Sequence, residues 1–309
     1  MTFSAKDVAD LRVKTGAGIM ECKNALKEAN GNIEKASELL RQKGLAAAAK
    51  KAEKTTLEGI VASKLSADKK SGAILELNTQ TDFVAKNEKF IELSKIMLDG
   101  ILSNKPSSLD QMLSTKSNGT QISEIISSRI ATIGENIQPR RFELFQLGSE
   151  NGVVGTYIHP VGNKIGVLIK LTASTNISGN INEIEELAKN IAMHIAASQP
   201  QPEYIDSTVI PKDVTENERR IELGKEDLAK KPKEIAEKIV QGRLEKILSQ
   251  RCLMAQPYIK DPNMTIEKLI KEKSKQLNSD IKVTQFVRYN VGEVLEKDIS
   301  KEQAAVSVT

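Results

Sequence analysis

Aromatic residues are scarce in this chain of 309 residues, which has six phenylalanines, four tyrosines and no tryptophan. Proteins that read single-stranded RNA stack its bases on exposed aromatic rings, so the scarcity argues against that class. The two cysteines, Cys22 and Cys252, are far apart and neither belongs to a Cys-x-x-Cys pair. This usage argues against a disulfide framework or a zinc site and fits a reducing compartment, so we expect the protein in the cytoplasm.

Catalytic and nucleotide-binding motifs are also missing. The sequence contains neither a Gly-x-x-x-x-Gly-Lys-Ser/Thr loop, which would hold phosphates, nor a Gly-x-Ser-x-Gly nucleophile elbow. Gly16 and Gly18 lack the third glycine of a dinucleotide-binding fingerprint. The only two histidines, His159 and His194, lack the spacing of a metal site. We therefore predict that the protein is not an enzyme and has no catalytic residues, cofactor or metal ligands.

The sequence also lacks long apolar runs and a large net charge. No stretch reaches the roughly 18 successive apolar residues of a membrane-spanning helix, and residues 1–4 do not begin a secretory signal. Apolar residues make up 39% of the chain and charged residues 28%, which is typical of a soluble globular protein. The net charge of +4 permits contact with nucleic acid but does not favour it.

Residues 1–54 predict a small helical unit. Residues 4–44 show three short amphipathic patterns separated by glycine-containing breaks, and Gly44 is expected to end the third helix. Residues 46–54 are rich in alanine and lysine, with high helix propensity and little to bury, and so predict a helical linker.

From residue 55 the apolar pattern changes to that of strands followed by helices. Residues 55–148 predict a strand hairpin, helices and a further strand. Residues 149–201 repeat the hairpin-plus-helix pattern, and residues 249–293 add a helix and a closing strand. The predicted fold class is therefore α+β, with two half-domains built on antiparallel sheets.

Residues 202–248 interrupt the second half and predict an inserted antiparallel helical hairpin. They are strongly charged, and Val214, Ile221 and Leu228 recur every seven residues before a break at 231–233. This apolar seam is narrow, so a solvent-exposed decoration and a contact surface both stay open. Residues 294–309 are a short polar tail.

The most informative stretch is residues 76–86, ELNTQTDFVAK. An apolar strand, residues 73–77, runs into polar residues, and Thr81 or Asp82 can cap the helix that follows. Asp82 and Phe83 would then stand on a corner between strand and helix, where proteins often place functional residues. For an isolated phenylalanine, the favoured interpretation would be that it pins the helix onto the sheet.

This stretch resembles the central signature of the bacterial translation elongation factor Ts family. Residues 11–26, LRVKTGAGIMECKNAL, resemble the family's amino-terminal signature, and residues 134–141, GENIQPRR, resemble a third family motif. The three motifs follow the family's order, and the resemblance covers residues 4–292. It implies that the first three helices fold like a ubiquitin-associated domain.

The resemblance implies a guanine-nucleotide exchange factor that binds elongation factor Tu, the GTPase that carries aminoacyl-tRNA. It also implies that the inserted hairpin contacts this partner or a second copy of the factor. The corner would be a wedge that disturbs the Mg²⁺ and nucleotide site of the GTPase. The implied wedge residues are Thr81, Asp82, Phe83 and Val84, and the other implied contact residues are Arg12, Ile19, Met20 and His159.

Two other functions stay open on the sequence alone. An RNA- or ribosome-binding protein would use the small helical unit and the lysine-rich linker, with a steep salt dependence. A ubiquitin-like adaptor would use only residues 1–44 and would leave the corner at Asp82 and Phe83 without a role. We expect neither a membrane nor a specific nucleic acid as a partner.

Overall fold

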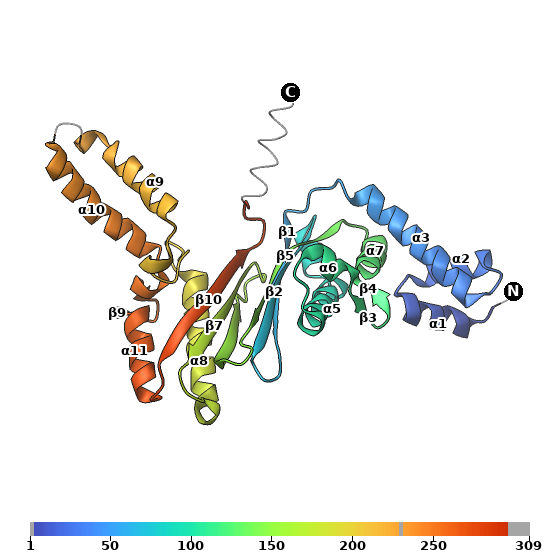
Figure 1. Ribbon diagram of the computed structural model, residues 1–309. Coiled ribbons are helices and arrows are strands. Elements are labelled where there is room, and N and C mark those ends of the chain that lie inside the picture. The colour runs from blue at the N-terminus through green and yellow to red at the C-terminus, as the bar shows by residue number, and fades with distance from the viewer. Residues whose placement is uncertain (1–2, 229–230, 296–309) are drawn as a thin grey trace.

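The computed structural model describes residues 3–228 and 231–295. Its elements form an elongated row: N-terminal helices at one end, two sheets with their helices in the middle, and a helical pair at the other end (Figure 1). Helices and small antiparallel sheets occur in separate stretches of the chain, so the predicted α+β class is confirmed. Among the described residues, no helix combines the length and apolar character that crossing a membrane requires.

The N-terminal unit is built from α1 (Ala5–Thr15), α2 (Ile19–Glu28) and the first part of α3 (Ile33–Lys51). Ser4 caps α1 and exchanges hydrogen bonds with Asp7, a reciprocal arrangement that satisfies free backbone N–H groups at the start of the helix. The three helices enclose a small core, formed by Leu11, Ala17, Cys22, Ala25, Leu26, Ala29 and Ala36.

Helix α3 does not end at Gly44, as the sequence predicted, but continues to Lys51. Its second half lies along α7 (Ile122–Ile133), and a β-carbon on Gly44 would be 3.6 Å from the backbone oxygen of Ser127. A β-carbon at this distance would be in ordinary van der Waals contact with α7, so the site does not require glycine. The packing of α3 along α7 outweighs the low helix propensity of glycine. The predicted linker is thus largely the docked end of α3.

The first sheet contains β1 (Glu58–Leu65), β2 (Ser71–Thr79) and β5 (Ile137–Gln146) in the order β1-β2-β5, with all pairs antiparallel. Helices α5 (Glu88–Asn104), α6 (Leu109–Ser114) and α7 cover its outer face. A short hairpin, β3 (Lys116–Ser117) and β4 (Thr120–Gln121), precedes α7. The central strand β2 is buried from its second residue to its last, because both of its faces are covered.

The second sheet has the order β10-β7-β6 and is also antiparallel throughout. Helices α8 and α11 pack on its outer face, around Val167, Ile169, Ile191 and Ile270. Its elements are β6 (Asn151–Ile158), β7 (Ile165–Ala173), α8 (Ile181–Ala197), β8 (Pro257–Tyr258), β9 (Asp261–Thr265), α11 (Ile266–Gln276) and β10 (Ile281–Asn290), with short 3₁₀ turns at Ser178–Asn180, Ser207–Val209 and Leu253–Ala255.

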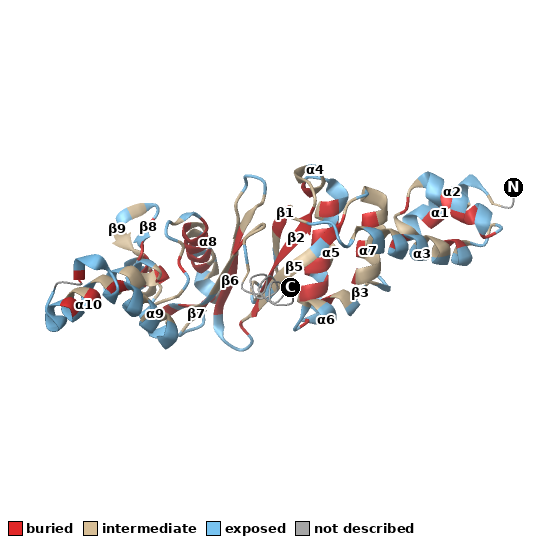
Figure 2. Ribbon diagram, turned by 90° about the horizontal axis from the view of Figure 1, so that it is seen from above, coloured by how far each residue is buried: buried red, intermediate tan, exposed pale blue. Residues whose placement is uncertain are grey.

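The two sheets pack against each other through their inner faces. Figure 2 shows the resulting layers, which run from α8 through the second sheet and the first sheet to α5. Apolar residues of both sheets meet in this interface, namely Val61, Ile74, Phe145, Leu147, Val154, Leu168 and Tyr289. The repeated hairpin-plus-helix pattern in the sequence therefore corresponds to two sheets packed face to face.

Helices α9 (Lys212–Leu223) and α10 (Lys233–Gln250) form the antiparallel pair at the far end of the molecule (Figure 1). The predicted seven-residue seam is wrong, because α9 ends at Leu223 and Leu228 lies in a separate 3₁₀ turn, Glu226–Leu228. Ile221, on α9, is about half exposed. The residues that pack between the helices are Leu228, Ala236, Ile239 and Val240.

His194 on α8 is a buried structural residue, as its apolar surroundings in the sequence indicated. The N–H of Ile259 donates to Nδ1 at 3.3 Å, so Nε2 carries the proton and donates to Oε1 of Gln256 at 3.0 Å. Gln256 in turn donates to the backbone oxygens of Pro200 and Gln250. These contacts suit a neutral imidazole, and burial lowers the pKa of His194 below its ordinary value of 6.5.

We expect this histidine to make the free energy of unfolding depend on pH. Its pKa is lower in the folded protein, so the unfolded chain takes up the proton first as the pH falls through 6.5. Stability is therefore complete above that pH and decreases below it, by at most about 1.4 kcal/mol per pH unit. Urea unfolding between pH 7.5 and 5 measures the slope. A His194→Gln variant should show a shallower slope, and equal slopes would contradict this account.

Candidate partner-binding site

The corner between strand and helix exists as a single helical turn, α4 (Asp82–Ala85). Thr81 is its N-cap, with an extended backbone, and its hydroxyl accepts a hydrogen bond from the N–H of Val84 at 3.4 Å. Ala85 is buried and Val84 packs against the core of the first sheet. The inner side of α4 is therefore fixed, and its outer side carries Asp82 and Phe83.

Phe83 points away from the core. Its side chain is 81% exposed, the highest exposure among the phenylalanines in the described residues. By contrast, Phe90 on α5 is completely buried, although it is only seven positions later. The sequence left open whether Phe83 pins the helix to the sheet, and the structure shows that it does not. A large apolar ring that is solvent-exposed on a rigid corner is suited to burial in a partner.

Asp82 places a carboxylate beside this ring. Its Oδ2 accepts a hydrogen bond from Nζ of Lys86 at 2.7 Å, and about half of the Asp82 side chain is exposed. The hydrogen bond from Lys86 lowers the pKa of Asp82 below its ordinary value, and the charges of Lys86 and Lys164 act in the same direction. The corner thus presents an ionised carboxylate next to an apolar ring.

Glu135 supports the corner from beneath. One carboxylate oxygen accepts from the hydroxyl of Thr79 and from the N–H of Thr81, both at 3.0 Å, and the other accepts from the hydroxyl of Thr81 at 2.7 Å. Sequence reasoning missed this residue. It lies in the motif of residues 134–141, which was a signal that the segment matters, but the motif does not reveal which strand end it contacts.

His159 lies in the turn between β6 and β7, which contacts the edge strand β1 of the first sheet. Its backbone N–H donates to the oxygen of Ile165, and its Nδ1 is 3.2 Å from the hydroxyl of Tyr157. The residue is half-buried. Lys164, from the same turn, forms an ion pair with Glu58 of β1 and lowers the pKa of Asp82. The structure thus brings this turn close to the corner.

Arg12, Ile19 and Met20 lie elsewhere, on α1 and α2. Figure 2 shows these helices at one end of the molecule, beyond α7, while α4 lies over the first sheet. All three side chains are exposed, Ile19 by 55% and Met20 by 63%, and Val13 beside them is exposed as well. α1 and α2 therefore carry the exposed apolar side chains of Val13, Ile19 and Met20 and the charged side chain of Arg12, all separate from the corner.

Known proteins are similar in sequence to this chain over nearly its whole length. A family model described as Elongation factor TS matches residues 80–293. A protein named Elongation factor Ts from Nostoc sp. is 43% identical over 300 residues, covering 96% of this chain and 95% of the relative. The chain belongs to the elongation factor Ts family. Relatives of the same name from Nostoc punctiforme (44% identity over 297 residues, 96% of this chain and 94% of the relative) and Syntrophotalea carbinolica (40% over 312 residues, 99% and 100%) extend the match.

Membership of the elongation factor Ts family makes this chain a translation elongation factor. The resemblance that the sequence showed in its three motifs is therefore confirmed. The structure also separates two tasks within the third motif, residues 134–141. Glu135 contacts the corner, while Arg140 and Arg141 contact Glu76 on the neighbouring strand β2.

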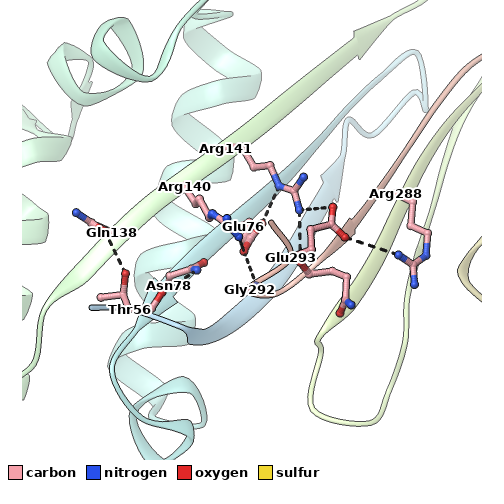
Figure 3. Close-up of polar contacts among 10 residues, drawn as sticks. Thr56, Glu76, Asn78, Gln138, Arg140, Arg141, Arg288, Gly292 and Glu293 are labelled. Atoms are coloured by element: carbon pink, nitrogen blue, oxygen red, sulfur yellow. Dashed lines mark hydrogen bonds and ion pairs between the residues drawn. The ribbon is translucent and has the colours of Figure 1, made fainter. Parts of the chain in front are cut away.

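The two arginines bind a buried carboxylate at the junction of the sheets (Figure 3). Glu76 on β2 is 0% exposed, and its oxygens accept from Nε of Arg141 at 2.7 Å, from Arg140 at 3.2 Å and from the N–H of Gly292 at 3.0 Å. Arg141 also binds Glu293 at 2.8 Å. The cluster therefore joins β2 and β5 to the segment that follows β10.

Proposed function

We propose that this protein binds elongation factor Tu and speeds the release of GDP by pushing the corner at Asp82 and Phe83 against the Mg²⁺ and nucleotide site of that GTPase. The observation that carries the proposal is the exposure of Phe83 on a capped, fixed helical turn. Family membership supports the choice of partner. As a translation factor with this role, the protein would work in the cytoplasm.

Linkage explains how binding can release a nucleotide. The factor binds best to the form of the GTPase that holds Mg²⁺ and GDP poorly. By the same linkage, bound nucleotide lowers the affinity of the GTPase for the factor by the same ratio. A coupling of several kcal/mol is sufficient, because each 1.4 kcal/mol changes an equilibrium about tenfold. The factor changes no covalent bond, so it acts as an exchange factor and not as an enzyme of a chemical reaction.

The corner supplies two kinds of interaction for this coupling. The ring of Phe83 gains apolar burial only when the partner opens to accept it. The carboxylate of Asp82 is ionised and half-exposed, so it can repel or compete with the oxygen ligands around a metal ion. His159, in the neighbouring turn, would add a contact at the same edge.

Release of labelled GDP tests the proposal. Elongation factor Tu is loaded with fluorescent GDP and chased with unlabelled GDP, with increasing amounts of this protein. We expect a release rate that rises with concentration and reaches a plateau. Tight binding of the two proteins without faster release would overturn the proposal. Salt-sensitive binding to RNA together with no effect on release would favour the RNA- or ribosome-binding alternative.

We expect the exposed apolar side chains of α1 and α2 to contribute more to the affinity for the GTPase than to the maximal rate of GDP release. The double substitution Ile19→Ser and Met20→Ser changes two exposed side chains, so the melting temperature should stay the same. The concentration of factor that gives half of the maximal release rate should increase roughly tenfold, since one or two anchors are lost. Val209→Ser, at a similarly exposed residue in another part of the chain, is the control. An unchanged concentration dependence would contradict this role.

A further inference from the structure

The orientation of Phe83 depends on the backbone that carries it. The ring is 81% exposed, so packing within this protein does not hold it in place. Helix α4 is only four residues long, too short to be stable without external support. Its end is held by Val84 and Ala85 in the core, and its start depends on Thr81. Whatever fixes Thr81 therefore fixes the direction of the wedge.

Glu135 is the side chain that fixes Thr81. Both of its oxygens are used, and they hold the last residue of β2 and the cap of α4 together through three hydrogen bonds. Hydrogen bonds to an ionised acceptor are stronger than bonds between neutral groups. The hydroxyl of Thr81 donates to Glu135 and accepts from Val84, so the carboxylate also orients the cap.

The segment that carries Glu135 is itself anchored. Gly134 ends α7 in the left-handed region, at φ 93°, which turns the chain back toward β2. Lys51 at the end of α3 donates to the oxygen of Gly134. Asn136 donates to the oxygens of Ala52, at 3.3 Å, and Lys54, at 2.9 Å. The backbone around Glu135 is therefore fixed independently of the corner, so its carboxylate can restrain the position of Thr81.

We propose that Glu135 is a positioning residue for nucleotide exchange, which keeps the corner rigid enough to displace groups of the partner. The inference rests on the proposed function. A rigid corner can gain its binding energy only when the partner deforms, so that energy appears in the exchange step. A flexible corner can instead adapt to the undistorted partner and bind it without deforming its nucleotide site. Loss of Glu135 should therefore lower the maximal exchange rate more than the affinity.

Glu135→Ala and Glu135→Gln in the full chain test this role. In the alanine variant we expect a maximal GDP release rate reduced at least about tenfold, because losing one charged hydrogen bond already corresponds to that factor and Glu135 accepts three. The half-saturating concentration should change less than about threefold. Glutamine keeps an acceptor for Thr79 and Thr81 and donates to the hydroxyl of Thr81, so it should restore the rate to within about twofold. Thr79→Val removes one of the three bonds and should give an intermediate rate, which provides a test if the alanine variant folds poorly.

Amide hydrogen exchange of the free variants gives a readout without the partner. In Glu135→Ala, residues 79–86 should exchange roughly tenfold faster while the rest of the chain is unchanged. Faster exchange throughout the protein would show a purely structural role and overturn the proposal. A wild-type release rate in Glu135→Ala would also overturn it, provided that the wild-type protein accelerates release and Phe83→Ala does not. If the wild-type protein itself fails to accelerate release, the proposed function is wrong, and so is a role for Glu135 in exchange.

Discussion

Phe83→Ala is expected to leave the melting temperature of the protein unchanged and to abolish most of its effect on GDP release. The ring is exposed and makes little contribution to the fold, so its removal leaves no cavity. In the complex, burial of an aromatic anchor is worth about 2–4 kcal/mol. That range corresponds to a loss of roughly 30-fold to 1,000-fold. Part of the loss should persist at saturating concentrations, because the ring also drives the deformation of the partner.

Phe90→Ala is the matched control for this prediction. Phe90 is completely buried between α5 and the first sheet, so its truncation should cost about 3–5 kcal/mol of folding stability. Thermal melts and stopped-flow GDP release on both variants separate a contact residue from a core residue. The wedge hypothesis fails if the Phe83→Ala variant is strongly destabilised and its folded fraction still accelerates GDP release as much as the wild-type protein does.

The second large effect is expected at Glu76, and it concerns stability. Glu76→Ala removes the acceptor of two arginines and of the N–H of Gly292, all from a site with no solvent exposure at the carboxylate. Breaking a buried ion pair from one side costs about 3–5 kcal/mol, because the remaining charges lose their buried counter-charge. We expect the lower part of this range, since Arg140 and Arg141 are each partly exposed. Urea unfolding at neutral pH measures the loss.

Asp99→Ala provides the comparison. Asp99 forms an ion pair with Lys64, and about half of each side chain is exposed. Such surface pairs contribute at most about 1 kcal/mol, so the variant should unfold at nearly the wild-type urea concentration. Similar losses in the two variants would show that burial of Glu76 has no special effect.

Local patterns in the sequence were sufficient to locate the corner. The apolar run of residues 73–77 and a helix cap at Thr81 or Asp82 follow rules that depend on neighbours in the chain. Both appear in the structure, where Thr81 is the cap. The exposure of Phe83 did not follow from those rules. Phe90 belongs to an apolar repeat with Leu93 and Met97, whereas Phe83 belongs to none, and only the packing of α4 shows that its ring faces solvent.

The sequence by itself therefore determined the family, the α+β class and the residues of the corner, because these depend on short motifs and on apolar periodicity. Tertiary structure decided the rest. The low helix propensity of Gly44 predicts a helix end, but α3 packs along α7 and continues past this residue. Glu135 meets Thr81, and Glu76 meets Arg141, only because β2 pairs with β5. Contacts between residues so distant in the chain depend on strand pairing, and no local rule contains that information.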